Sequence, residues 1–352
     1  MLGLKKIIAL ALVCMTLCTL LLSGCAAGKK NDDNTLYVFN WGDYIGEGVI
    51  DLFEKETGVK VVYEMYEQNE DMYTKISSGG SNYDVVFPSD YMVEKLVKEG
   101  LLAEINFDNI PNFALIDDKL KDQAYDPGNK HSVPYMWGTM GILYDTTRVS
   151  DPITSWTALW DPQYEREILM WDSVRDGIGL TAKMLGYSMN TTNDAELADI
   201  KAKLLEQKPL VLSYAGDQMK DQMTAGEAIM AVMYSGDAVT VIENNEDMAY
   251  VVPEEGSNIW FDSVCILKNS KHKELAEKFI NFLCRTDVAE MNRAYINFAT
   301  PQTEVFAALP DEIREDPVQY PDDDVYAKCE VYVDIGEYAK VYDQIWTEVL
   351  AD

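Results

Sequence analysis

Apolar and polar residues follow two different periods in the first third of the chain. Runs rich in β-branched and aromatic residues predict strands at 36–39, 59–66 and 83–89. Between these runs, apolar residues recur at helical spacing, and Gly58 and Gly100 end two of the predicted helices. Strands separated by helices of this length indicate a mostly parallel sheet covered by helices on both faces. This part of the chain therefore predicts an α/β fold.

The rest of the chain continues the mixture of apolar runs and helix patterns. The long apolar stretches lie at 133–145, 228–239, 248–253 and 259–268. Helices are predicted around 180–188, over a segment with Leu197, Ile200, Leu204 and Leu205 on one face, and at 273–283. A chain of this length can form two lobes with a core each.

The N-terminus has the pattern of a lipoprotein signal peptide. Two lysines precede the apolar run 7–22, which ends in Leu-Ser-Gly-Cys. This ending resembles a bacterial lipobox, which implies removal of residues 1–24 and a diacylglyceryl anchor on Cys25. The small and polar segment 25–33 predicts a tether. We therefore expect an extracytoplasmic protein, lipid-anchored to the cell membrane, that contacts the membrane through this anchor only.

The acidic composition restricts the choice of partner. The chain has 60 Asp and Glu residues against 29 Lys and Arg, for a net charge of -31. Loss of the two leader lysines changes the net charge from -31 to -33. Nucleic acid is excluded as a partner, because phosphate binding needs a basic face. The charge suits a cationic ligand, although many exported proteins are acidic merely for solubility.

Three cysteines remain beyond the lipidation site, at positions 265, 284 and 329. Their number is odd and their spacing does not match a metal site. Cys265 lies in an apolar run and Cys284 lies on the apolar face of a helix, so we expect both to be buried as small hydrophobic residues. A disulfide between two of the three cannot be deduced from the sequence.

The sequence lacks the catalytic and cofactor motifs that would indicate an enzyme. The sequence has no G-x-S-x-G elbow, no H-E-x-x-H zinc motif and no P-loop. His131 and His272 stand in polar surroundings without an obvious partner, which predicts surface residues. Gly177 and Gly179 loosely match a dinucleotide fingerprint, but the preceding Asp172 and Asp176 would repel a pyrophosphate. We therefore expect no catalytic residue, no metal and no cofactor.

One composition recurs five times: an aromatic residue and an aspartate together at a strand end or turn. In an α/β sheet, strand ends converge on the crevice where ligands bind, so the five clusters are predicted to line one site. A positive nitrogen is attracted both to aromatic faces and to carboxylates. The clusters are Trp41, Asp43 and Tyr44; Ser89, Asp90 and Tyr91; Trp171, Asp172 and Asp176; Tyr234 and Asp237; and Trp260 and Asp262.

From residue 36 nearly to its end, the chain resembles the spermidine/putrescine-binding proteins of bacterial ABC importers. The matching stretches include TLYVFNW, KETGVKV, YDVVFPS, SVPYMWGTMGI, SWTALWDP, IWFDS and KFINFL. The resemblance implies a type II periplasmic-binding-protein fold, in which two α/β lobes are joined by two crossover strands and close over a ligand. The first lobe would contain residues 34–138 and 262–306, and the second residues 139–261 and 307–352.

The resemblance also implies roles for individual residues. Carried over, the aromatic wall would comprise Trp41, Tyr44, Tyr91 and Trp260. The acids that hold the terminal ammonium groups would be Asp43 at one end and Asp176 and Asp262 at the other, with Ser89 as a hydrogen-bond partner. Tyr234 stands where the family commonly has Trp. The family also commonly has Thr-Glu at Gly42-Asp43, Asp at Ser173, Tyr at Phe298 and Gln near Tyr332, and the acid missing at Ser173 could be offset by Asp90 or Asp237.

These observations favour a solute receptor that captures spermidine, putrescine or both and delivers the ligand to an ABC permease. A polyamine has an ammonium group at each end and methylenes between them, so it needs separated acids and flat rings. We expect such a receptor to act as a monomer. A receptor of the same fold for a sugar or a metal ion is the alternative, and an exported glycosidase that uses two of the acids is another. The sequence leaves the ligand preference, the affinity and the permease open.

The lipobox generates a direct prediction about Cys25. A Cys25→Ala variant should fold normally but lose its membrane attachment, because the thiol is the only expected site of lipid addition. Metabolic labelling with a radioactive fatty acid, followed by membrane fractionation, measures this loss. Retention of the label on the variant would contradict the assignment.

Overall fold

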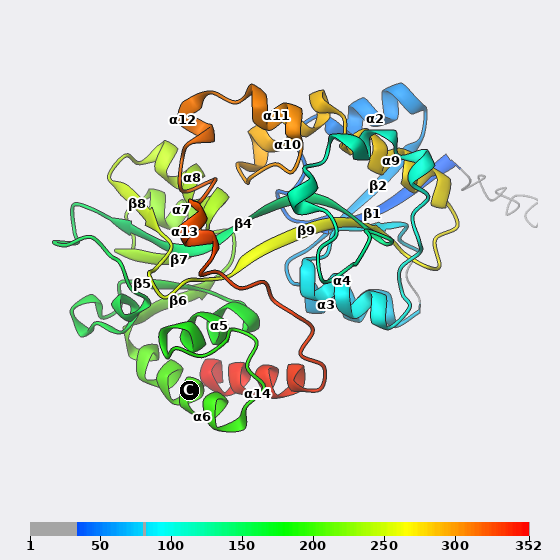
Figure 1. Ribbon diagram of the computed structural model, residues 1–352. Helices are drawn as coiled ribbons and strands as arrows, with labels where there is room; N and C mark the ends of the chain where they lie inside the picture. The colour runs from blue at the N-terminus through cyan, green and yellow to red at the C-terminus, as the bar shows by residue number, and fades with distance from the viewer. Residues whose placement is uncertain (1–33, 80–81, 352) are drawn as a thin grey trace, which may run out of the picture.

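The computed structural model describes residues 34–79 and 82–351. The predicted signal peptide, Cys25 and the tether lie outside these residues. Figure 1 shows two groups of helices and strands side by side, with two long strands running through both groups. In the described part of the chain, no helix is both long and apolar enough to cross a membrane.

The strands form one continuous sheet in the order β2-β1-β3-β9-β4-β7-β5-β6, with β8 paired to β4. Strand β1 runs parallel to β2 and β3, and β5 runs parallel to β6 and β7. All antiparallel pairs involve β4 or β9. The strands are β1 Thr35–Trp41, β2 Lys60–Tyr66, β3 Val85–Val86, β4 Ser132–Asp145, β5 Ile168–Trp171, β6 Val211–Ala215, β7 Met230–Tyr234, β8 Met248–Val251 and β9 Ile259–Ile266.

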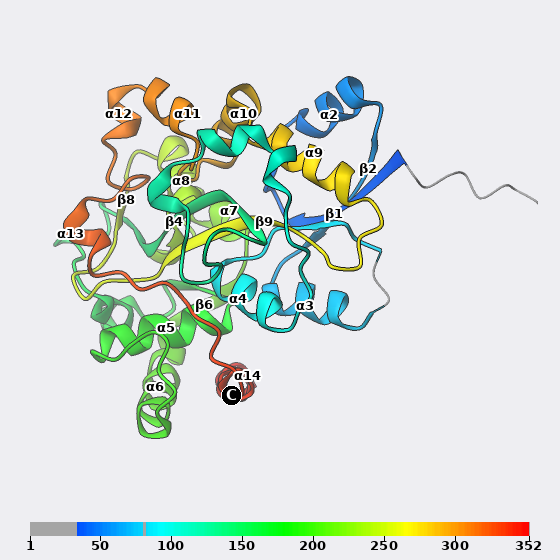
Figure 2. The ribbon, with the colours of Figure 1, turned by 45° about the vertical axis from the view of Figure 1, so that its right-hand side comes forward.

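Helices cover both faces of each part of the sheet (Figures 1 and 2). Their bounds are α2 Val49–Thr57, α3 Asn69–Ser77, α4 Asp90–Lys98, α5 Val174–Met184, α6 Asp194–Gln207, α7 Met219–Thr224, α8 Ser235–Asn244, α9 Lys273–Leu283, α10 Thr286–Ile296, α11 Thr303–Ala308, α12 Asp311–Arg314, α13 Asp323–Tyr326 and α14 Tyr338–Ala351.

Strand β4 connects the two parts of the sheet. Its first half pairs with β9 as far as Thr139, and its second half pairs with β7 and β8 from Met140 onward. Two strand groups joined by the crossing strands β4 and β9 confirm the predicted α/β fold with two crossovers. The change of partners falls next to the proposed boundary between residues 138 and 139, although the division into lobes stays a prediction.

Side chains of β1 alternate between two cores, as expected for a strand buried on both faces. Leu36 and Val38 pack in one cluster with Phe53 of α2 and Phe279 of α9. Phe39, on the opposite face, packs in a second cluster with residues of α3 and α4. This double burial explains why the strand has few polar residues.

The C-terminal helix α14 was not predicted from the sequence. Both views place it beside α5 and α6 (Figures 1 and 2). Its Tyr342 and Trp346 are buried against these helices. A Cβ atom on Gly177 would lie 2.1 Å from the Trp346 ring, so close packing explains this glycine without a dinucleotide site.

The packing around β4 generates a stability prediction. A Cβ atom on Gly141 would lie 2.4 Å from the Val251 carbonyl oxygen and 2.6 Å from the Tyr250 ring. Gly141→Ala should therefore lower the free energy of unfolding by about 1 to 3 kcal/mol, as overpacked cores do. Gly216→Ala is the control, because its nearest neighbour is a flexible side chain at 3.6 Å. Equal urea midpoints for the two variants would contradict the prediction.

Candidate functional site

All five aromatic and acidic clusters line one cavity of about 550 Å³, which we call the main cavity. The clusters come together because strand ends meet there. Trp41 ends β1, Trp171 ends β5 and Tyr234 ends β7. Strand β9 runs antiparallel to β3, so Trp260 at its beginning lies at the same edge. The convergence follows the general rule for ligand sites in α/β sheets.

Asp262 is a buried carboxylate with one free oxygen. The Tyr44 hydroxyl donates a hydrogen bond of 2.7 Å to Oδ2, whereas Oδ1 has no hydrogen-bond partner among the described residues. Burial raises the pKa of Asp262 to about 6, although the Ser89 and Tyr44 side chains lower it. A buried anion without a full set of partners favours the approach of a cationic donor.

Asp176 is held by two tyrosine hydroxyls. Tyr234 donates to Oδ2 at 2.6 Å and Tyr332 donates to Oδ1 at 3.2 Å. Burial raises the pKa of Asp176, while hydrogen bonds from Tyr234, Ser173 and Tyr332 lower it. Ser173 also caps α5 through the backbone N–H of Asp176. Ser173 therefore serves to start the helix.

Aromatic rings form much of the remaining wall. The Trp260 ring lies edge-to-face with Tyr234 at 5.9 Å and with Phe298 at 4.8 Å. The Trp41 ring lies 4.6 Å from Tyr66, and its Nε1 donates to the Phe87 carbonyl at 2.7 Å. These contacts fix the ring planes of the walls.

Tyr91 connects elements from the two sides of the main cavity. Its hydroxyl donates to Glu70 at 2.9 Å and accepts from Asn69 at 3.1 Å. The Arg175 guanidinium carbon lies 5.0 Å from the Tyr91 ring centre and 4.5 Å from that of Tyr332, which indicates cation–π contacts. The sequence showed no signal for Arg175, because a buried arginine in a helix pattern resembles an exposed one.

The two acids that could offset the missing carboxylate at Ser173 have other partners. Asp90 is fully buried and accepts from the backbone N–H groups of Tyr91 and Phe261, at 2.7 and 3.1 Å. Asp237 forms an ion pair with Lys220 at 3.3 Å. Asp90 therefore stabilises the local backbone, and Asp237 lies next to a cation of the protein itself.

Negative charge dominates the main cavity. Among the described residues, ten carboxylates line it against two cations, Arg175 and Lys220, which leaves a formal charge of −8. Burial is the largest cause that raises the pKa of Glu70, Asp90, Asp176, Asp217, Asp237 and Asp262. Such a cavity is matched to a ligand that carries several positive charges.

The nine residues that the sequence predicts as ligand contacts all line this cavity. Several other residues that line it were not predicted from the sequence. The missed residues include Tyr66, Asn69, Glu70, Arg175, Tyr214, Asp217 and Lys220. Most of these lie on helices or on strands away from the clustered motifs, where single polar residues carry no distinctive pattern.

The expectation that both histidines lack partners was wrong. His131 Nδ1 lies 3.1 Å from Asp126, and His272 Nδ1 lies 3.1 Å from Asp84. Both aspartates are buried and also accept from serine hydroxyls, so the pairs hold loops in place. The burial of Cys265 and Cys284 is confirmed, and the three described cysteines are free.

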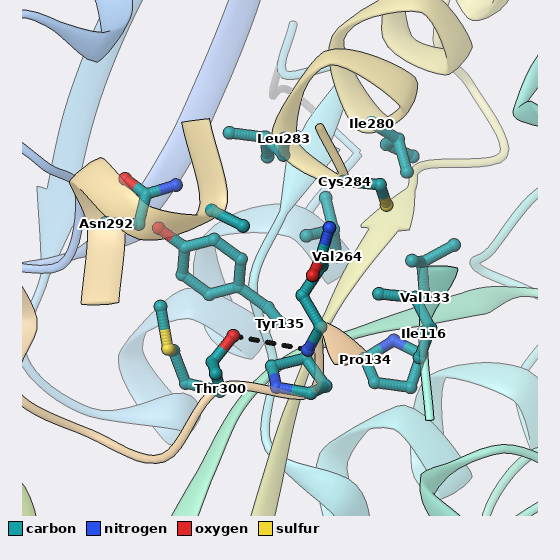
Figure 3. A pocket seen from close by; sticks show the side chains of 14 residues that line it. Ile116, Val133, Pro134, Tyr135, Val264, Ile280, Leu283, Cys284, Asn292 and Thr300 are labelled. Carbon is teal, nitrogen blue, oxygen red and sulfur yellow. Dashed lines mark hydrogen bonds between the residues drawn. The ribbon is translucent and has the colours of Figure 1, made fainter. Parts of the chain in front are cut away.

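A second, much smaller cavity lies between β4, β9 and helices α9 and α10 (Figure 3). Its volume of about 20 Å³ has room for about one water molecule. Most of the labelled side chains are apolar, and the one hydrogen bond drawn runs from the Gln302 backbone N–H to Thr300. This cavity is too small for an organic solute. Within the described ranges, no group of His, Cys, Asp or Glu residues could hold a metal ion.

Two strand groups joined by two crossing strands, with a charged cavity at the strand ends, are typical of the periplasmic binding proteins. The chain belongs to the bacterial extracellular solute-binding proteins, because the model of this family matches residues 48–319.

Relatives match over nearly the whole chain. The spermidine/putrescine-binding periplasmic protein of Salmonella typhimurium is 35% identical, over 93% of this chain and 95% of its own length. The solved substrate-binding protein PotD of Streptococcus pneumoniae is 36% identical with a TM-score of 0.78. The TpPotD lipoprotein of Treponema pallidum is 28% identical with a TM-score of 0.81. Both alignments cover 90% of this chain and 99% of the solved one.

The raised pKa of Asp262 generates a prediction about stability. The folded state holds this proton up to about pH 6, whereas the unfolded state releases it near the ordinary pKa of 3.8. The carboxylate therefore destabilises the ligand-free fold above pH 6, and this cost disappears as pH falls toward 3.8. When the pH is lowered from 7.5 to 5, the free energy of unfolding of the parent should rise. In Asp262→Asn this rise should be smaller by about 1 kcal/mol.

Urea unfolding of the ligand-free protein at both pH values measures this difference. Asp247→Asn is the control, because Asp247 is exposed in the turn between α8 and β8. The same pH response in Asp262→Asn and in the parent would contradict a raised pKa at this position.

Proposed function

We propose that the protein is a receptor that captures a polyamine in the main cavity and delivers it to an ABC permease. The observation that carries the proposal is the pairing of an excess of carboxylates with aromatic walls in one cavity. The names of the relatives support the same ligand class. A neutral sugar would leave the buried charge unpaired, which is unfavourable.

The nine predicted residues provide the contacts that a polyamine needs. Asp43, Asp176 and Asp262 would accept hydrogen bonds from ammonium groups, and Ser89 would add a neutral partner. The rings would cover the methylenes; they belong to Trp41, Tyr44, Tyr91, Tyr234 and Trp260. No proton transfer or nucleophile takes part, so the proposed receptor is not an enzyme.

The expected affinity follows from typical magnitudes. Hydrogen bonds to charged groups contribute about 1.5 to 3 kcal/mol each, and buried cation–π contacts contribute up to about 2 kcal/mol. Micromolar binding needs about 8 kcal/mol. Two or three acids with two or three rings can therefore supply micromolar binding after the ordering costs.

The two lobes would close over the ligand, with residues 34–138 and 262–306 on one side and 139–261 and 307–352 on the other. Contacts already cross between these segments, since Gln68 donates to the Asp172 carbonyl at 3.2 Å. We further propose a lipid anchor on Cys25, which holds a monomeric receptor next to its permease. A lipoprotein among the solved relatives supports the anchor.

Calorimetric titration tests the ligand. The chain from residue 26 onward should bind spermidine, putrescine or both, and should not bind glucose. Binding should also raise the melting temperature, because the ligand stabilises only the folded state. Absence of both heat and a melting shift with millimolar spermidine and putrescine would overturn the proposal.

Asp262→Asn tests the site itself. The asparagine keeps the size and hydrogen-bonding capacity but removes the anion, so polyamine binding should weaken by about 1.5 to 3 kcal/mol, roughly ten- to a hundred-fold. The variant should be at least as stable as the parent at pH 7.5, because the change removes a buried charge. Asp247→Asn changes the net charge equally and should bind like the parent. If Asp262→Asn also binds like the parent, the carboxylate is not part of the site.

A further inference from the structure

A lysine of the protein lies among carboxylates at one side of the main cavity. Lys220 belongs to α7, and its Nζ lies 3.3 Å from Oδ1 of Asp237 in the first turn of α8. The lysine side chain is 22% exposed and the aspartate side chain is 12% exposed. The pair is therefore partly shielded from solvent, where an ion pair is stronger than at an open surface.

Two further carboxylates surround this pair. A Cβ atom on Gly42 would lie 3.4 Å from Oδ2 of Asp217, so Asp217 reaches the turn that carries Asp43. Burial lowers the pKa of Lys220, but Asp237, Asp217 and Asp43 together raise it above the ordinary value. Lys220 is thus a charged ammonium group that pairs with Asp237 and interacts electrostatically with Asp217 and Asp43.

The other acids of the main cavity are not neutralised in this way. In the part of the chain that the structure describes, neither Asp176 nor Asp262 forms an ion pair with a lysine or arginine within 4.0 Å. Asp262 also keeps its unpartnered Oδ1. These two carboxylates are available to a ligand, whereas the group around Lys220 already holds an alkylammonium.

The lysine side chain resembles the end of a polyamine, because both are four-carbon alkyl chains with a terminal ammonium. A tethered group competes at a high effective concentration, and a free ligand must displace it to use the same carboxylates. A third ligand ammonium that entered this group would also face repulsion from Lys220. A diamine that does not enter this group would avoid both costs.

We infer that Lys220 is a specificity-determining residue that makes the main cavity favour a diamine over a triamine. The inference rests on the proposed function. It deepens that function, because it names the number of ammonium groups that the site accepts. Lys220 acts as an internal substitute for the third ammonium and pairs with Asp237 in its place.

Calorimetric titration with putrescine and spermidine tests the inference in the chain from residue 26 onward. Lys220→Met keeps most of the side-chain volume and removes the charge. The ratio of spermidine affinity to putrescine affinity should rise at least ten-fold in this variant. Lys220→Arg keeps the charge and should retain the parent ratio. Lys203→Met makes the same chemical change at an exposed ion pair on α6 and should also retain it.

The outcomes separate the inference from the proposed function. A parent protein that binds neither polyamine overturns the proposed function and the inference with it. A parent that binds polyamines, with the same affinity ratio in Lys220→Met, overturns the inference alone. Equal increases for both ligands also overturn it, because they reflect only the change in net charge. A ratio that rises in Lys220→Met but in neither control supports the inference.

Discussion

Burial of negative charge is the constraint on which the rest of this structure depends. A carboxylate removed from water is costly unless hydrogen bonds or a cation compensate it, and the main cavity contains an excess of such groups. The protein meets this cost locally in several ways. Tyrosine hydroxyls hold Asp176 and Asp262, backbone N–H groups hold Asp90, and a lysine pairs with Asp237. The remaining deficit is what a polycationic ligand would satisfy.

The same constraint explains why so many hydroxyl-bearing rings surround the acids. A tyrosine presents an apolar face and a polar end, so it can close a cavity wall and donate to a carboxylate at once. Tyr234 does both, since its ring lies against Trp171 and Trp260 while its hydroxyl donates to Asp176.

The sequence was informative where function and local pattern coincide. Trp41, Trp171 and Tyr234 end strands with clear apolar patterns, so the convergence of the clusters could be predicted from elementary sheet geometry. Tyr332 could not, because it reaches Asp176 from a distant C-terminal segment that only tertiary packing positions. The predicted strand 83–89 shortened to β3 for a local reason. Pro88 has no N–H group to donate to a neighbouring strand.

The antiparallel contact between β4 and β9 has a mechanical consequence. Hydrogen bonds join these strands from Ser132 to Thr139, and β3 and β7 extend the same network on either side. Sliding of one half of the molecule past the other would break this network along its length, whereas bending or twisting of a two-stranded ribbon preserves it. The halves can therefore change their angle at low cost but not their register. The residues that face each other across the cavity therefore stay the same when this angle changes.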